Sequence, residues 1–417
     1  MDRVATVNAR IGWKALTAAE YQPEGYAFLS TPNIKGGEID FFNVNYISEF
    51  RYEESPELKL RPGDVLLAKD GNTLGIVNII RDLPRPATVN GSIAVIRSTG
   101  IESSYLRYVL ASRTTQETIN MLKGGMGVPH LFQWDINRLP VPLPPLEEQR
   151  RIADFLDAET NRINDLQQRT ASQLALLQEQ FHETMRFWTT VGNDEASPTK
   201  IPWMPKMNPN WSLLKVGHQF ITGSGTTPTS TVAEYFDGPH WWVNSGDLND
   251  GEVTSSEKTI TDRALNDFPA LKLHSRGSLV IAMYGQGATK GKVGLLTKRA
   301  CVNQACCVLS ATGKISTQYA RYWFRAHKES VVALAQGAGQ PNLSQELVRS
   351  LWIPAPDMAE QQKIVFRLAR GEEQLSRKVQ LLRERETLLT ERRQALITAA
   401  VTGQIDVSTA SGRGIEE

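Results

Sequence analysis

The sequence predicts an α+β protein in which two similar α+β domains are joined by two long antiparallel coiled-coil helices, as an internal repeat with pseudo-twofold symmetry. Three observations lead to this prediction. An unusual phrase occurs twice, as PPLEEQRRIADFL at 144–156 and as PDMAEQQKIVFRL at 356–368. Other segments of the two halves align in the same order. Each phrase also opens a long charged stretch whose apolar residues have helical spacing.

The alignment of the halves covers four further pairs of segments. KGGEI (35–39) matches NDGEV (249–253), RPGDVLLAKDG (61–71) matches SRGSLVIAMYG (275–285), TVNGSIAVIRS (88–98) matches CVNQACCVLS (301–310), and GVPHL (127–131) matches GQPNL (339–343). Runs of β-branched residues bounded by Gly and Asn predict short strands in each half. The stretches 105–122 and 319–335 have the apolar spacing of a helix. Each half is therefore expected to be α+β.

The two long helices are expected to pair through apolar seams. In the second helix the leucines recur at every seventh position, as a coiled-coil seam requires: Leu368, Leu375, Leu382, Leu389 and Leu396. The first helix has a looser seam, interrupted by Thr170 and made of Ile152, Leu156, Ile163, Leu166, Leu177 and Phe181. An ordinary amphipathic helix packed on its own domain is the alternative. It is less favoured, because a helix of this kind would extend about 65 Å, more than the width of such a domain.

The repeat divides the chain into expected segments. The expected boundaries are a first domain at 1–145, a first helical region at 146–190, a linker at 191–210, a second domain at 211–357, a second helical region at 358–403 and a tail at 404–417. The linker is expected because 191–210 is dense in Pro, Asn, Asp and Ser, which are typical of turns and loops.

Composition excludes little. The 417 residues include 46 basic and 45 acidic ones, and a net charge of +1 neither favours nor excludes a polyanionic partner, because the charges can be segregated in space. The three cysteines, Cys301, Cys306 and Cys307, lie close together without the additional ligands of a tetrahedral zinc site, and we expect buried strand thiols. No signal peptide or membrane-length apolar run is found, so a cytoplasmic protein is expected.

Motifs of catalysis are missing from the sequence. GATKGKV (287–293) departs from the phosphate-binding P-loop in its glycine spacing and in its last residue. Asp40, Glu57 and Lys59 could imitate the carboxylate and lysine set of a metal-dependent nuclease, and this alternative stays open. No metal site and no catalytic residue are predicted.

Glycine-rich turns after two of the expected strands carry residue types that serve phosphates and base edges. Such turns allow a close backbone approach to a ligand, and Lys, Asn and Gln are the matching side chains. The candidate DNA-binding residues are Lys69, Asn72 and Thr73 in the first half, and Tyr284, Gln286, Thr289, Lys290 and Lys292 in the second. A second loop pair adds Lys123, Gln340 and Asn342. Alternatively, these are solvated turn residues, and Asn342 or Ser344 caps a helix.

Four segments, in this order and at this spacing, resemble the specificity subunit of type I restriction-modification enzymes. They are VPLPPLEEQRRIADFLD (141–157), WSLLKVG (211–217), IPAPDMAEQQKIVFRL (353–368) and ALITAAVTGQIDV (395–407). The resemblance covers essentially the whole chain. The first half, however, begins without a counterpart of WSLLKVG, so its domain is expected to lack a strand or to borrow one.

The resemblance implies two target-recognition domains that each read one part of a split, asymmetric DNA site. It also implies that the helices dock two methyltransferase subunits and, through them, the restriction and motor subunits. No cofactor is expected in this chain, and S-adenosylmethionine, ATP and Mg²⁺ are expected in the partner subunits. A coiled-coil scaffold that binds no DNA is the alternative from another class.

Overall fold

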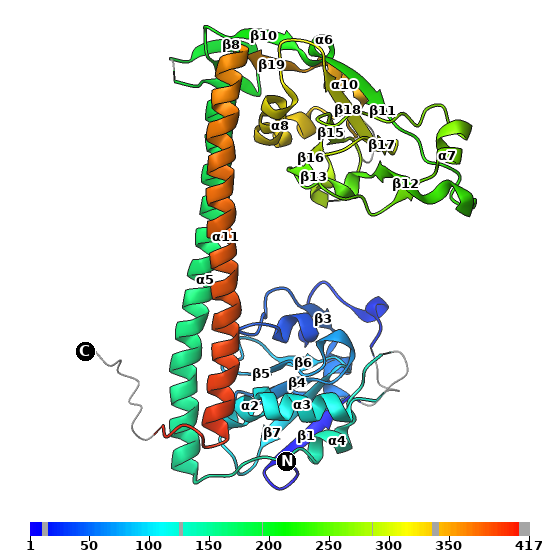
Figure 1. The fold of residues 1–417 in the computed structure, drawn as a ribbon. Helices are drawn as coiled ribbons and strands as arrows, with labels where there is room; N and C mark the ends of the chain where they lie inside the picture. The colour runs from blue at the N-terminus through cyan, green and yellow to red at the C-terminus, as the bar shows by residue number, and fades with distance from the viewer. Residues whose placement is uncertain (11–15, 125–127, 194, 286, 336–341, 408–417) are drawn as a thin grey trace. The chain divides into compact units, whose positions relative to one another are not determined.

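The computed structural model describes residues 1–10, 16–124, 128–193, 195–285, 287–335 and 342–407 (Figure 1). Its contacts divide the chain into two compact units. Unit 1 consists of Met1–Ser172 and Leu382–Glu417, and unit 2 consists of Gln173–Leu381. Each unit contains sheets, short helices and part of each of the two long helices, so the α+β class is confirmed.

The described part of unit 1 contains two β-sheets. A four-stranded antiparallel sheet has the order β1-β7-β4-β5, and a three-stranded sheet has the order β3-β2-β6. The strands are β1 (Ala5–Ala9), β2 (Tyr26–Leu29), β3 (Asn45–Ile47), β4 (Val65–Ala68), β5 (Val77–Ile79), β6 (Ala87–Val89) and β7 (Ile93–Ser98). Along β4, Val65 and Leu67 join one buried cluster while Leu66 and Ala68 join another, so the larger sheet is covered on both faces.

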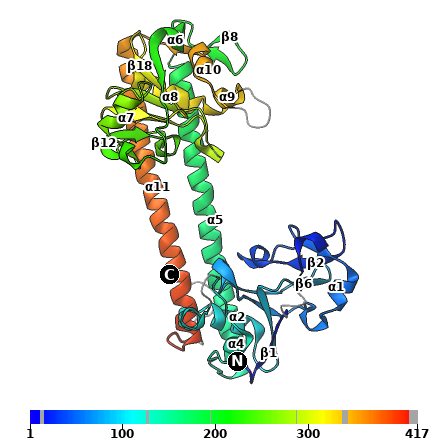
Figure 2. The same cartoon turned by 90° about the vertical axis from the view of Figure 1, so that its right-hand side faces the viewer.

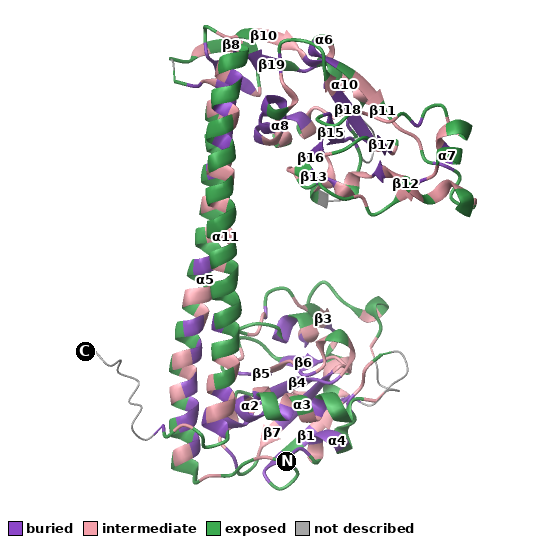
Figure 3. Cartoon of the chain, viewed as in Figure 1, coloured by how far each residue is buried: buried purple, intermediate pink, exposed green. Residues whose placement is uncertain are grey.

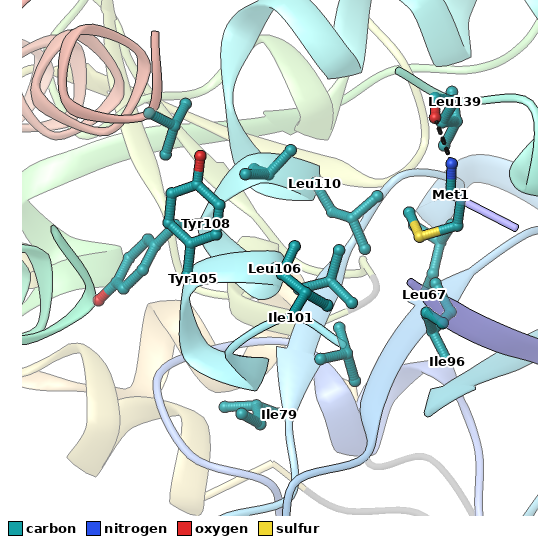
Figure 4. Close-up of a cluster of buried hydrophobic side chains, with 14 of the residues drawn as sticks. Met1, Leu67, Ile79, Ile96, Ile101, Tyr105, Leu106, Tyr108, Leu110 and Leu139 are labelled. Carbon is teal, nitrogen blue, oxygen red and sulfur yellow. Dashed lines mark hydrogen bonds between the residues drawn. The ribbon is translucent and has the colours of Figure 1, made fainter. Parts of the chain in front are cut away.

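One face of this sheet is covered by helices of unit 1. Apart from the long helices, the helices are α1 (Glu49–Glu53), α2 (Ser103–Ala111), α3 (Arg113–Leu122) and α4 (Gln133–Asn137). Figure 4 shows Leu67 and Ile96 of the sheet among Tyr105, Leu106 and Leu110 of α2. The same picture shows the amino group of Met1, which donates a hydrogen bond to the carbonyl of Leu139 at 3.0 Å.

The stretch 105–122 is two helices, and the single helix expected from its periodicity is wrong. Ser112 lies between α2 and α3 in extended conformation, with φ −65° and ψ 148°. Its hydroxyl accepts a hydrogen bond from the backbone N–H of Thr115 and so caps α3. Apolar spacing alone does not reveal such a break, because the two helices bury adjoining faces.

Unit 2 repeats the sheet plan. A five-stranded sheet has the order β11-β18-β15-β16-β13, a three-stranded sheet has the order β14-β12-β17, and β10 pairs with β19. The strands are β8 (Ser197–Ile201), β9 (Met204–Met207), β10 (Ser212–Lys215), β11 (Phe220–Ser224), β12 (Phe236–Val243), β13 (Glu252–Val253), β14 (Thr259–Ile260), β15 (Leu279–Ala282), β16 (Val293–Leu296), β17 (Ala300–Val302), β18 (Cys306–Ala311) and β19 (Trp352–Ala355). In each small sheet the middle strand has one parallel and one antiparallel neighbour.

In its described residues, unit 2 has five short helices, and it departs from the sequence prediction in two places. The helices are α6 (Val216–Gln219), α7 (Asp262–Asp267), α8 (Thr317–Ala326), α9 (Lys328–Ala333) and α10 (Gln345–Ser350). The stretch 319–335 is divided at His327 into α8 and α9. The expected linker 191–210 contains the hairpin β8-β9, in which Met204 and Met207 are buried. Trp203 of this hairpin packs edge-on against Trp323, which explains why a segment rich in turn formers is ordered.

The two long helices are α5 (Leu146–Thr190) and α11 (Met358–Val401). In unit 1, Gln167 donates to the hydroxyl of Thr390 at 3.1 Å and Arg393 donates to Asn164 at 2.9 Å. In unit 2, Phe181 lies against Gly371, and the guanidinium of Arg367 lies 3.8 Å from the ring centre of Trp188. In both units, later residues of α5 contact earlier residues of α11, so the two helices pack antiparallel.

The seam residues of both helices are buried or half-buried (Figure 3). Ile152, Leu156, Ile163, Leu368 and Leu389 are buried, and the half-buried ones are Leu166, Leu177, Leu375, Leu382 and Leu396. Thr170, which interrupts the first seam in sequence, is buried as well. Its hydroxyl donates to the carbonyl of Leu166 at 2.7 Å, so the helix itself satisfies the polar group.

The repeated phrase contains one glutamine that has the same task in both units. Gln149 and Gln361 are 3% and 1% exposed. The side-chain oxygen of Gln149 accepts the backbone N–H of Glu102 at the start of α2, and its amide donates to the carbonyl of Pro144. Gln361 likewise accepts from Ser316 at the start of α8 and donates to Pro356. This glutamine ties the start of α2 in unit 1, and the start of α8 in unit 2, to the beginning of a long helix.

A carboxylate on each long helix reinforces this attachment. In unit 2 Glu372 accepts from Arg321, Arg325 and the hydroxyl of Tyr322, at 2.9, 2.5 and 2.9 Å. Burial raises the pKa of Glu372, but the two guanidinium groups outweigh it, and the net pKa is lowered. In unit 1, where α2 lies beside α5 (Figure 2), Asp157 of α5 accepts from the hydroxyl of Tyr108 on α2 at 2.6 Å.

The missing counterpart of WSLLKVG has a visible consequence. In unit 2, β10 (Ser212–Lys215) pairs with β19 just before α11. In unit 1, residues 139–145 before α5 form no strand. Instead, Ile405 and Val407, which follow α11, pack against the core of unit 1. The absence of a strand at 139–145 agrees with the prediction that the first domain lacks a strand or borrows one.

Candidate nucleic-acid interface

The end of β4 in unit 1 is held by backbone hydrogen bonds on two sides. The N–H of Lys69 donates to the carbonyl of Ser92 at 2.8 Å, and the N–H of Leu131 donates to the carbonyl of Lys69 at 2.9 Å. The N–H of Gly71 donates to Pro129 at 2.8 Å, with Gly71 at φ 71°, a conformation that suits glycine. Residues 69–71 are thus fixed between two other loops.

Unit 2 has the same backbone frame after β15. The N–H of Met283 donates to the carbonyl of Ala305 at 2.7 Å, and the N–H of Leu343 donates to the carbonyl of Met283 at 3.1 Å. Lys69 and Met283 therefore hold equivalent positions, as the sequence alignment predicts. The backbone is shared by the two units, while the side chains on it differ.

A pocket opens beside this frame in unit 1. Its volume is about 560 Å³, and its lining includes Tyr21, Phe28, Asn90 and Ser92. Arg10, which directly follows β1, is another lining residue and is only 6% exposed. Its guanidinium donates to the carbonyl of Val89 and to the hydroxyls of Ser55 and Thr88, at 3.4, 3.3 and 3.5 Å. Burial lowers the pKa of Arg10.

Three charged or titratable side chains meet at the wall of this pocket. Lys69 is 7% exposed, and its ammonium group donates to Asp70 at 3.1 Å. The other carboxylate oxygen of Asp70 is hydrogen-bonded to Nδ1 of His130. The three residues come from two loops that are distant in sequence, and the bridge between Asp70 and His130 joins the backbones of these loops.

The corresponding positions of unit 2 carry uncharged residues. Met283, Tyr284 and Asn342 stand where unit 1 has Lys69, Asp70 and His130. Gly225, which follows β11, corresponds to Arg10, and a Cβ there would lie 1.5 Å from the carbonyl oxygen of Val302. An arginine is therefore excluded at this point of unit 2. The frame is repeated, but its donors and acceptors are not.

The glycine-rich turn of unit 2 instead has a basic surface. Tyr284 is 38% exposed, while Thr289, Lys290 and Lys292 are half-buried. Lys328, on α9, donates to the carbonyl of Ala288 at 2.7 Å and so adds a third ammonium group to this turn. Burial lowers the pKa of Lys328, and the nearby Lys292 lowers it further. Sequence analysis missed Lys328, because it lies on a helix far along the chain.

The other candidate residues fall into different groups. Asn72, Lys123 and Asn342 are exposed, and Lys123 donates to Asn120 at 3.2 Å. Thr73 supports the turn by donating to the carbonyl of Asp70 at 3.3 Å. Ser344 caps α10 by accepting from the N–H of Leu347, which confirms one of the two alternatives for that segment. Two candidates lie outside the described residues, namely Gln286 and Gln340.

The nuclease alternative has no support in the structure. The side chain of Asn43 donates a hydrogen bond to Asp40, and so do the N–H groups of Asn43 and Phe42. These bonds cap a turn and lower the pKa of Asp40. Lys59 is paired with Glu53 at 2.5 Å. Within the described ranges, no group of three His, Cys, Asp or Glu residues could hold a metal ion.

The three cysteines are buried free thiols, as expected. Burial raises the pKa of Cys301 to about 11 and that of Cys307 to about 12, and it raises the pKa of Cys306 as well. Thiols of this kind are inert. Among the described residues, no helix has the length and the apolar composition that would let it cross a membrane.

The family model of the type I restriction modification DNA specificity domain matches the chain twice, at residues 16–176 and 210–386. The chain belongs to this family. The family forms the non-catalytic specificity subunit of type I restriction-modification systems, so the role of this chain is DNA recognition within such a system. The family assignment favours neither the scaffold nor the nuclease.

Individual relatives agree with the family match. The chain is 22% identical over 410 residues to the type I restriction enzyme MjaVIII specificity subunit of Methanocaldococcus jannaschii. This alignment covers 95% of this chain and 90% of the relative. It is 23% identical over 161 residues to the EcoKI specificity subunit of Escherichia coli, over 38% of this chain and 34% of the relative.

Solved structures show the same fold. One chain, from a structure described as the basis of complex assembly and conformational transition of the type I R-M system, has a TM-score of 0.72 at 16% identity and covers 96% of this chain and 98% of that one. The HsdS subunit from Thermoanaerobacter tengcongensis has a TM-score of 0.51 at 16% identity, with 91% of each chain covered.

Proposed function

We propose that this chain reads a bipartite, asymmetric DNA site, with one half-site for the domain at 1–145 and the other for the domain at 211–357. The observation that carries this proposal is the double match to a DNA-specificity model, on halves that share one strand plan. Two copies of one frame with different side chains suit two different half-sites. A symmetric reader would need identical side chains.

The proposal includes the partners. The long helices, with the glutamine of each repeated phrase at their beginnings, would dock two methyltransferase subunits and, through them, the restriction and motor subunits. S-adenosylmethionine, ATP and Mg²⁺ would be bound by those subunits in the cytoplasm. With a net charge of +1, the phosphate contacts that dominate DNA affinity would come from local basic loops of this chain or from basic surfaces of the partners.

Methylation mapping tests this function. Cells that carry this chain and its methyltransferase partner are expected to show one bipartite methylated motif. Replacing residues 211–352 with the equivalent part of a relative should change one half of that motif and leave the other half intact. The matched control replaces the equivalent part of the first domain and should change only the opposite half. A single continuous motif, or a change of both halves by one replacement, would contradict the proposal.

A further inference from the structure

We infer that the pocket of unit 1 reads guanine, and that Lys69 and Asp70 are the residues that determine this specificity. The inference rests on the proposed function and goes further by naming a base and two residues. It begins with the composition of the pocket, in which a donor and an acceptor stand side by side at one wall. A ligand that matches both must itself offer an acceptor next to a donor.

This requirement argues against a phosphate. A phosphate oxygen only accepts hydrogen bonds, and the carboxylate of Asp70 would repel it. A nucleobase, by contrast, has both donors and acceptors on one planar edge. The exposed ring of Tyr21 in the pocket lining suits a planar ligand, and the volume of about 560 Å³ falls in the ordinary range for ligand pockets.

Guanine fits the Lys69 and Asp70 pair on either of two edges. In a paired duplex, O6 and N7 of guanine accept in the major groove and the N4 amino group of its cytosine donates, so lysine serves the guanine and aspartate serves the cytosine. If the base leaves the duplex, O6 accepts from lysine while N1–H and the N2 amino group donate to aspartate. Adenine also offers an acceptor beside a donor in the major groove, N7 beside N6, but guanine presents two adjacent acceptors, N7 and O6, to the ammonium group of Lys69. Both sources share the same chemistry, a guanine O6 beside a donor.

The ammonium group has capacity for this contact. Lys69 has three N–H donors, and among the described residues its one hydrogen-bond partner is Asp70. A buried ammonium group with donors to spare is costly unless a ligand or water completes its hydrogen bonds. The backbone bonds of Lys69 to Ser92 and Leu131 fix its position before the ligand arrives, which reduces the entropy lost on binding.

Unit 2 supplies the internal comparison. Its frame holds Met283 and Tyr284 at the equivalent positions, and neither has a charged donor or acceptor for guanine. The two units would therefore place different demands on the base at this point of their half-sites. Because methionine already occupies the frame in unit 2, it is also a residue that the frame accepts, which makes Lys69→Met a suitable test.

The experiment uses the complex of this chain with its methyltransferase partner, first by methylation mapping in cells. The unaltered chain should give a bipartite motif with a fixed G·C pair in the half-site of the first domain. Lys69→Met should lower the preference for that pair by about tenfold or more, at that position alone, because a good base contact provides this discrimination. Asp70→Asn, which preserves the size of the side chain, should relax the same position.

Lys35→Met is the matched control. Lys35 is an exposed lysine of the same unit. Its replacement also removes one positive charge, but from the surface and not from the pocket, so it should leave the motif unchanged. If Lys69→Met and Asp70→Asn only weaken methylation uniformly over an unchanged motif, the pair does not read a base and the inference is wrong. A motif that is not bipartite in the unaltered chain would instead overturn the proposed function, so the two failures are distinguishable.

Base analogues identify the edge. Duplexes with 7-deazaguanine at the assigned position lose N7 and should bind the complex more weakly if the paired base is read in the major groove. Duplexes with hypoxanthine lose the N2 amino group and should bind more weakly if the base is extruded. In both cases the loss should disappear in the Lys69→Met and Asp70→Asn complexes. A loss that persists unchanged in these variants would assign the contact to other residues and overturn the inference.

Discussion

Gln361 allows a quantitative test of how each domain is attached to the long helices. Its side chain makes three hydrogen bonds, accepting from Ser316 at 2.9 Å and donating to Lys314 at 2.7 Å and Pro356 at 2.9 Å. Gln149 makes two, with Glu102 at 2.9 Å and Pro144 at 2.8 Å. A hydrogen bond contributes about 1 kcal/mol to stability, and more is lost where a buried backbone group is left without a partner. Gln361→Ala should therefore lower the free energy of unfolding by about 3 kcal/mol and Gln149→Ala by about 2 kcal/mol.

Hydrogen exchange on the complex, followed by mass spectrometry, measures these effects separately in the two units. Gln361→Ala should speed exchange at the start of α8, and Gln149→Ala should do so at the start of α2. The control is Gln362→Ala, which alters an exposed neighbour on the same helix and should change stability by less than about 0.5 kcal/mol. Equal effects of Gln361→Ala and Gln362→Ala would refute the reasoning, and so would a larger effect from Gln149→Ala than from Gln361→Ala.

Three further results are expected. Glu372→Gln should destabilise unit 2 by about 1 kcal/mol after allowance for solvent screening. In the unaltered chain this contribution should be lost as the pH falls below the ordinary carboxyl pKa of 4.5, because the pKa of Glu372 is lowered in the folded state. Denaturant titration at pH 7 and pH 4 measures the contribution, and a loss of stability on raising the pH would contradict the prediction. Burial lowers the pKa of His327 to about 3, so unit 2 should lose stability as the pH falls from 6.5 towards 3, and His327→Gln should flatten this dependence in thermal melts; an unchanged slope would assign it to other groups. An aromatic disulfide reagent should leave all three cysteines unmodified in the folded chain and modify all three after denaturation, because the thiols are buried with raised pKa values; rapid modification of the folded chain would show that a thiol is exposed.

The long helices and the main strands could be predicted from sequence because their signals are local. The run VLLA at 65–68 forms β4, because a short continuous apolar run bounded by turn formers is typical of a strand that is buried on both faces. The heptad leucines lie on α11, because seven-residue spacing follows from burial of one helix face. The breaks at Ser112 and His327 could not be predicted in this way. At Ser112 a side-chain cap competes with continued helix, and apolar spacing runs on through the break.

The candidate site was predictable only in outline. The sequence indicated the glycine-rich turn and Lys69, because a turn after a strand is a local pattern. Arg10, Asp70 and His130 were missed as a group, since their proximity depends on strand pairing and on the bridge between two loops that are distant along the chain. An alignment of the two halves contains the signal that could have indicated this group. At the aligned positions the first half has charged residues where the second half has uncharged ones, although the backbones match.

The division of the chain into units has a consequence for biosynthesis. Unit 2 is one continuous stretch, Gln173–Leu381, whereas unit 1 needs both Met1–Ser172 and Leu382–Glu417. The core of unit 1 includes Ile397, Ala400 and Val401 from the end of α11. A ribosome that makes this chain from its amino end therefore completes the second domain's unit before the first domain's. Part of the apolar surface of the N-terminal domain therefore stays uncovered until residues 397–401 have been synthesised.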